Sequence, residues 1–299
     1  MSSAVEQERV SKDFDAEALL RFDIPEAKQR YSRKDAAFYA LSIGIGRNPL
    51  EARQLAFTDH RRADFMAFPT AVLILAYPGF WLGDEKTQAV TGVDPRRILH
   101  ISQEIEWHES LPPEGDVVGQ SRIIDLIDKG CGRGSILLSE REIVEVVSGR
   151  KLATLRQGHY LRGHGGIGSG PEKPREPAPA TASSPCDSLV AIRTYPEQAL
   201  LYRMNGDENP LHCDPAVARS AGYPKPILHG LCTLGLVCHA LLETLLEYQS
   251  ARLRKVRFQM TAPVFPGETL QVEMWRNGAF CARVAERENL IVGKGEICI

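Results

Sequence analysis

Two stretches of the 299-residue sequence repeat one another, one in each half of the chain. Residues 34–50 read KDAAFYALSIGIGRNPL and residues 197–211 read EQALLYRMNGDENPL, so each has a short amphipathic segment with Tyr, then Gly, then Asn-Pro-Leu. A turn of Pro, Glu and Gly follows in each half, at residues 113–115 and 266–268. Because these landmarks recur in the same order, we expect a duplicated fold with two similar units.

A segment rich in Gly, Pro, Ala and Ser separates the two repeats. Residues 163–185 read GHGGIGSGPEKPREPAPATASSP, a composition that sustains neither a helix nor a central strand. We therefore expect a first unit at residues 1–162, a linker at residues 163–187 and a second unit at residues 188–299. A mere surface loop would predict no relation between the flanking sequences.

The two units differ in one element. After His229-Gly230 the second half continues LCTLGLVCHALLETLLEY, whose apolar residues recur at helical spacing and predict one long buried helix. The first half has only residues 69–77 in the corresponding place, which makes it a degenerate copy without most of that helix. Strand-like runs follow in both halves, so the fold class is α+β, with antiparallel strands wrapping a helix.

Composition and charge exclude several classes of protein. The 36 basic and 38 acidic side chains give a net charge of −2, which does not favour a nucleic acid partner. The longest apolar run, residues 71–77, is far shorter than the ~18 residues of a membrane span. Seven cysteines without a CxxC pair indicate a reducing compartment, and the acidic first twenty residues and the C-terminal sequence show no targeting signal. We expect a soluble intracellular protein.

Functional residue types are densest in residues 202–235, YRMNGDENPLHCDPAVARSAGYPKPILHGLCTLG. Asn209 precedes a proline, so it should cap a short turn that begins at Pro210. Asp207 then lies just before this turn and His212 within it, so both side chains can reach one small cavity. Asp214-Pro215 and Gly222 predict a second short helix in the same way.

The long helix should present its positive end to this cavity. Its first amides, beginning with Gly230, have no partner within the helix and favour an anion or a developing oxyanion. An acid–base pair that holds one water, together with an N–H that holds a carbonyl oxygen, is what hydration of an α,β-unsaturated thioester requires. Asp207 and His212 would share proton transfer, Gly230 would stabilise the enolate-like oxygen, and Asn209 would orient the water or the pair.

Two other interpretations of these residues stay open at this point. Asp207 can be a turn residue, Asn209 only a cap and His212 a structural histidine. A metal site is the second alternative, with four ligands whose spacing matches no usual zinc pattern: His212, Cys213, His229 and Cys232.

The string YRMNGDENPLH at residues 202–212, followed by PILHGLCT at residues 226–233, resembles the hydratase motif of the MaoC-like family. It is especially similar to the hydratase region of the eukaryotic peroxisomal multifunctional enzyme, and further landmarks extend the resemblance over nearly the whole chain. The resemblance implies two hot-dog folds in one chain, a double hot-dog. It also implies that the aspartate, asparagine, histidine and oxyanion glycine of the family are Asp207, Asn209, His212 and Gly230.

The same resemblance implies a reaction. The substrate would be trans-2-enoyl-CoA, an acyl-CoA thioester, the product (3R)-hydroxyacyl-CoA, and the enzyme a homodimer without metal or redox cofactor. The compartment would be the peroxisomal matrix or the cytoplasm, and the shortened helix of the first half would leave room for medium or long acyl chains. A thioesterase or a non-catalytic acyl-CoA-binding protein of the same fold is the alternative, because fold alone does not fix function.

Overall fold

One antiparallel sheet of ten strands forms the centre of the computed structural model, which describes residues 14–168 and 185–299. The first half supplies five strands: β1 (Ala27–Tyr31), β2 (Ile98–Trp107), β3 (Gly115–Asp128), β4 (Ser135–Glu145) and β5 (Lys151–Leu161). The second half supplies the other five: β6 (Ser188–Arg193), β7 (Lys255–Met260), β8 (Thr269–Met274), β9 (Ala279–Val284) and β10 (Leu290–Cys298).

The strand order is the same in both halves. Across the sheet it runs β1-β3-β4-β5-β2-β7-β10-β9-β8-β6, so each half, counted from its own outer edge, has its first, third, fourth, fifth and second strand in that order. The halves meet where β2 pairs antiparallel with β7, with Glu104 opposite Arg257 and Ile105 opposite Val256. This repeated topology is the α+β fold that the sequence predicts. The expected unit boundaries stay a prediction, since most of the linker, residues 169–184, lies outside the described residues.

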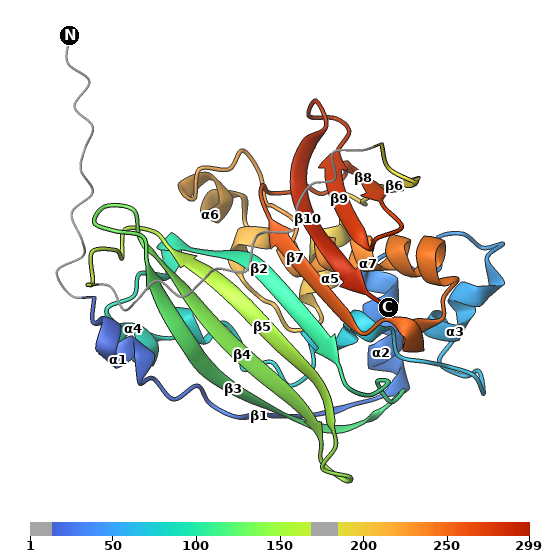
Figure 1. Ribbon diagram of the computed structural model, residues 1–299, viewed down its shortest axis with the longest axis horizontal. Helices are drawn as coiled ribbons and strands as arrows, with labels where there is room; N and C mark the ends of the chain where they lie inside the picture. Colours follow the sequence, from blue (N-terminus) through green and yellow to red (C-terminus); the bar gives the residue numbers. More distant parts are fainter. Residues whose placement is uncertain (1–13, 169–184) are drawn as a thin grey trace.

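The helices gather on one side of the sheet, which curves around α2, α5 and α7 in Figure 1. They are α1 (Ala16–Leu20), α2 (Arg33–Ser42), α3 (Leu55–Thr58), α4 (Glu85–Thr91), α5 (Gln198–Arg203), α6 (Pro215–Ser220) and α7 (Gly230–Leu246). Six short 3-10 helices complete the described chain: η1 (Ala52–Gln54), η2 (Pro69–Leu73), η3 (Trp81–Gly83), η4 (Pro95–Arg97), η5 (Pro210–His212) and η6 (Ser250–Arg252).

α7 is the long apolar helix that the sequence predicts. Leu234, Val237 and Leu241 lie on it at helical spacing and are each at most 1% exposed, because the helix packs inside the curved sheet. In the first half the corresponding segment forms only the five-residue η2, as expected for the degenerate copy. No helix in the part of the chain that the structure describes has the length and hydropathy of a membrane span.

Buried polar contacts join the two halves around α7. His239 on α7 is 7% exposed, and its Nε2 lies 3.1 Å from the hydroxyl of Tyr248. Gln54 of the first half donates to the same hydroxyl at 2.9 Å. Desolvation by this packing lowers the pKa of His239 to about 4. The ring is therefore neutral at physiological pH.

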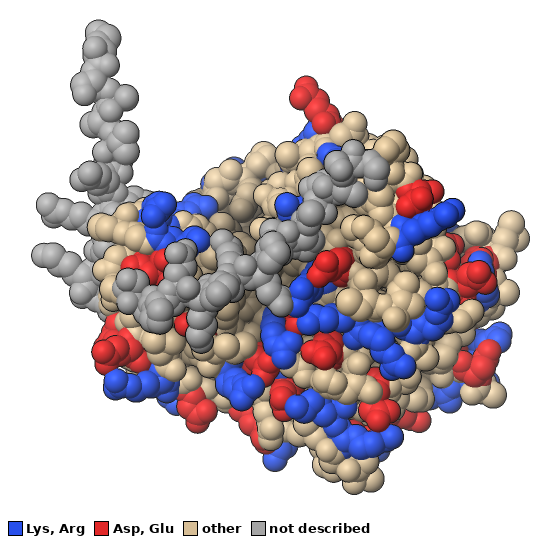
Figure 2. Space-filling model, viewed as in Figure 1, with Lys and Arg blue, Asp and Glu red and all other residues tan. Residues whose placement is uncertain are grey.

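The opposite face of the sheet is charged. Glu104 on β2 binds Arg257 and Lys255 of β7, at 2.6 and 2.8 Å, and Arg156 of β5 at 2.7 Å. Figure 2 shows this mixture of acidic and basic side chains over the exposed face of the strands. The sheet thus has a solvated charged face and an inner face toward the helices, and the functional residues are found on the inner side.

Candidate active site

Asp207 and Asn209 lie on a tight turn between α5 and η5, and His212 is the last residue of η5. Asn209 is the N-cap of η5, with its Oδ1 accepting from the Leu211 amide at 3.0 Å, and Pro210 occupies the first helical position. The Asn209 amide donates to Asp207 Oδ1 at 3.3 Å. Asp207 and Asn209 therefore do have the turn and cap roles of the plainer interpretation, and the same hydrogen bonds fix their position beside His212.

One ring nitrogen of His212 is hydrogen-bonded to the backbone. Its ring is 9% exposed, and Nδ1 lies 2.9 Å from the carbonyl oxygen of Ile227, which accepts a hydrogen bond from an N–H. This contact fixes the tautomer with the proton on Nδ1, so Nε2 is the nitrogen that can exchange a proton with a substrate. Burial lowers the pKa of His212, while the negative charge of Asp207 opposes that shift. Such a ring is a neutral base at physiological pH.

His229, the N-cap of α7, completes the group. Its ring is 1% exposed and stacks on His212 with ring centroids 3.7 Å apart, and its Nε2 lies 3.3 Å from the carbonyl oxygen of Asp207. Burial, and then the neighbouring His212, lower the pKa of His229 to about 2. Two stacked imidazoles are unfavourable when both are charged, so His229 stays neutral beside His212, and its contact with the Asp207 carbonyl joins the Asp207 loop to α7.

The sequence indicated His229 only as the start of a helix and as a ligand of the alternative metal site. In the described residues, Asp207, His212 and His229 bring one ligand-type atom each to within 4.8 Å of the others. Cys213 and Cys232 are not part of this group. An imidazole binds a metal ion through a ring nitrogen, and His212 Nδ1 and His229 Nε2 each already lie within hydrogen-bonding distance of a backbone carbonyl oxygen. The geometry favours acid–base chemistry over the four-ligand metal site.

Gly230 is the first residue of the 17-residue α7, directly after His229. Amides in the first turn of a helix have no partner within the helix and lie at the positive end of its dipole. A Cβ at Gly230 would lie 2.5 Å from Met260 Sδ on β7, so any side chain there would displace Met260. Glycine thus lets Met260 of β7 pack directly against the start of α7.

The matching turn of the first half has lost these groups. Alignment of the two Asn-Pro-Leu strings places Gly46 at the position of Asp207 and Glu51 at that of His212. Gly46 has a φ of +90° and its amide donates to Gln54, while Glu51 caps η1 and pairs with Arg53. In the described residues, the turn of the first half therefore has no counterpart of the Asp207 and His212 side chains.

Comparison with known proteins identifies related chains for both halves. A model of the MaoC like domain matches residues 171–298, and a model of the MFE-2 hydratase 2 N-terminal domain matches residues 29–163. The probable enoyl-CoA hydratase 2 of Dictyostelium discoideum is 33% identical over 88% of this chain and 87% of its own length. The peroxisomal enoyl-CoA hydratase 2 of Arabidopsis thaliana is 33% identical over 94% of both chains.

Solved structures agree with these matches. A MaoC-like dehydratase from Phytophthora capsici superposes with a TM-score of 0.79 at 30% identity, over 95% of this chain and 98% of its own. A Mycobacterium tuberculosis protein described as a double hotdog fold superposes with a TM-score of 0.55 at 14% identity, over 93% and 94% of the two chains. The latter likeness concerns the fold alone.

Proposed function

The chain belongs to the MaoC-like hydratase family, and on that premise we propose that it hydrates trans-2-enoyl-CoA to (3R)-hydroxyacyl-CoA, and catalyses the reverse dehydration, with Asp207 and His212 as its acid–base pair. The enzyme is a hydro-lyase of the double hot-dog fold. The observation that supports the site assignment is the grouping of Asp207 and His212 with His229, the residue directly before Gly230 at the start of α7.

The proposed reaction adds one water across a double bond. Water is held between the Asp207 carboxylate and His212 Nε2. As its oxygen adds to C3 of the enoyl group, Nε2 takes one of its protons, and negative charge moves to the thioester oxygen in front of the Gly230 amide. The protonated His212, stabilised by the negative charge of Asp207, then donates this proton to C2. Both atoms of the broken O–H bond end on the product, and the enzyme is restored.

Asn209 has a positioning role in this scheme. Its Oδ1 is used by the Leu211 amide, so its Nδ2 is the group that can orient the water or the pair. We propose no metal or redox cofactor, because proton transfer and an amide donor supply all that hydration requires. The homodimer and a location in the peroxisomal matrix or cytoplasm are likewise proposals, which sedimentation and imaging of the tagged protein can test.

The test is hydration of crotonyl-CoA, followed by loss of the enoyl absorbance and chiral analysis of the product. Asp207→Asn and His212→Gln should each lower kcat by at least about a hundredfold with unchanged thermal unfolding. Asp214→Asn is the matched control, since Asp214 is an exposed N-cap of α6 and asparagine caps equally well. Release of free CoA without hydration would identify a thioesterase, and binding without turnover would identify a non-catalytic acyl-CoA-binding protein.

A further inference from the structure

The inner face of β4 changes from apolar to polar and back along the strand. Side chains on one face of a strand come from every second residue, and on this face they are Leu137, Ser139, Arg141 and Ile143. Leu137 and Ile143 belong to two separate apolar clusters. Ser139 and Arg141 therefore occupy a polar stretch between two parts of the core.

Polar side chains of the neighbouring strands extend this stretch. Ser121 of β3 lies opposite Arg141, and Gln157 of β5 lies opposite Ser139. These four residues line one wall of a small cavity, and apolar and aromatic residues line the other wall: Ile24, Tyr77, Pro78 and Trp81. The space between the walls has room for about one water molecule.

Arg141 is a buried cation with unused donors. The residue is 4% exposed, and its Nη2 donates to the carbonyl oxygens of Leu73 at 2.8 Å and Val72 at 3.3 Å. Its Nε and Nη1 are buried and have no hydrogen-bond partner among the described atoms. Burial lowers the pKa of Arg141 to about 10, so the guanidinium remains charged at neutral pH.

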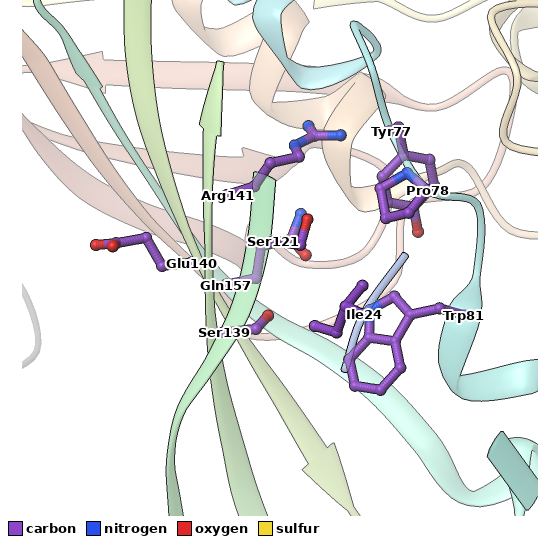
Figure 3. Close-up of a pocket in the computed structure, with 9 residues that line it drawn as sticks. All are labelled: Ile24, Tyr77, Pro78, Trp81, Ser121, Ser139, Glu140, Arg141 and Gln157. Carbon is purple, nitrogen blue, oxygen red and sulfur yellow. The ribbon is translucent and has the colours of Figure 1, made fainter. Parts of the chain in front are cut away.

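No acidic side chain compensates this charge in residues 14–168 and 185–299. Figure 3 shows the Arg141 guanidinium extending from β4 toward Tyr77, while Glu140 points away on the other side of the strand. Glu140 pairs with Arg122 and Arg156 on the charged face of the sheet. A buried cation without a counter-charge strongly destabilises a folded protein, so this site favours a negatively charged ligand.

We propose that the cavity binds one monatomic anion, with chloride as its natural ligand and Arg141 as the counter-charge. The residues of the polar wall offer N–H and O–H donors and no carboxylate, which suits an anion and not a cation. The small volume excludes acetate, phosphate and other polyatomic anions, whereas chloride is only slightly larger than water. A water molecule could accept the same hydrogen bonds but would leave the charge of Arg141 uncompensated.

The anion would stabilise the segment that replaces the long helix in the first half. The hydrogen bonds of Arg141 Nη2 join β4 to η2, and Thr70 of η2 accepts from the Tyr39 hydroxyl at 2.9 Å. An anion on the other donors of Arg141 holds the guanidinium in the orientation that these bonds require. The site is therefore structural, and its test measures stability independently of the proposed hydratase reaction.

Thermal unfolding of the whole chain in sodium chloride and in sodium acetate, at equal ionic strength, tests the site. Replacing acetate by about 200 mM chloride should raise the unfolding temperature of wild type by about 3 °C, the shift expected for a Kd of about 10 mM. Bromide should act like chloride. Arg141→Met should lose this rise, whereas Arg122→Met, on the charged face of the neighbouring strand, is the matched control and should keep it.

Crystals of wild type soaked in sodium bromide give a second measurement, which needs no variant. Bromide scatters anomalously, so an anomalous difference peak should lie within hydrogen-bonding distance of Arg141 Nε and Nη1. Three results would overturn the assignment. They are a water molecule in place of bromide at this position, equal unfolding temperatures of wild type in chloride and acetate, and the full chloride shift in Arg141→Met.

Discussion

His239→Gln should make the protein more resistant to acid. The His239 ring is buried between Gln54 and Tyr248, where its pKa falls from 6.5 to about 4. Above pH 6.5 the ring is neutral in both the folded and the unfolded chain and has no effect on the pH dependence of stability. As the pH falls below 6.5, His239 becomes protonated in the unfolded chain but not in the folded chain, so the free energy of unfolding decreases.

The size of the effect follows from the two pKa values. At pH 5 the unfolded histidine is protonated and the folded one mostly is not, a difference of 1.5 pH units that corresponds to about 2 kcal/mol. His229, with a folded pKa of about 2, adds about 2 kcal/mol in the same direction. At pH 5, His239 and His229 together thus lower the free energy of unfolding by a large part of the roughly 5–15 kcal/mol that is typical of a folded protein.

Urea unfolding at pH 7.5 and pH 5 measures this directly. Wild type should lose about 2 kcal/mol more between these pH values than His239→Gln does, because glutamine keeps a hydrogen-bonding group beside Tyr248 without titrating. The exposed His108 provides the control, and His108→Gln should follow wild type. Parallel pH profiles of wild type and His239→Gln would refute the neutral buried state of His239.

Three further predictions concern the proposed catalytic residues and the matching position of the first half. In Asp207→Asn/His212→Gln, kcat should fall little below the worse single variant, because both groups act on one water; fully additive losses would contradict this. Gly230→Ala should lower kcat/KM by displacing Met260, and adding Met260→Ala should restore part of it; no recovery would remove steric access to the amide as the cause. Glu51→Gln should keep kcat within about threefold of wild type, and calorimetry should find one acyl-CoA per chain, not two.

Local sequence signals predicted the elements that carry the site. The Asn209-Pro210 pair specifies the cap and first residue of η5, and Asp214-Pro215 with Gly222 specifies α6, because these residue types restrict the backbone directly. The apolar run after Gly230 likewise gives α7. These signals act within a few residues, which is why they can be recognised in a single sequence.

Contacts between distant segments were not predictable in this way. His229 stacks on His212, although the two residues are 17 positions apart and lie on different elements, α7 and η5. Only the packing of these two elements against each other brings the rings together. In the sequence of β4, Arg141 stands between Glu140 and Glu142, as a residue of an ordinary exposed strand would. Only the register of β4, which turns Ser139 and Arg141 inward and Glu140 outward, gives it a buried position.

The pairing of β2 with β7 suggests how such a chain arose. A gene encoding only the second half would produce a protein whose β7 exposes a row of unpaired amides and carbonyls, and β7 of a second copy is the simplest strand to cover it. Fusion of two such genes turns that dimer into one polypeptide and frees its halves from being identical. In this chain the second half keeps Asp207 and His212, while the first half has only η2 in place of the long helix, with Arg141 bound to its Leu73 carbonyl.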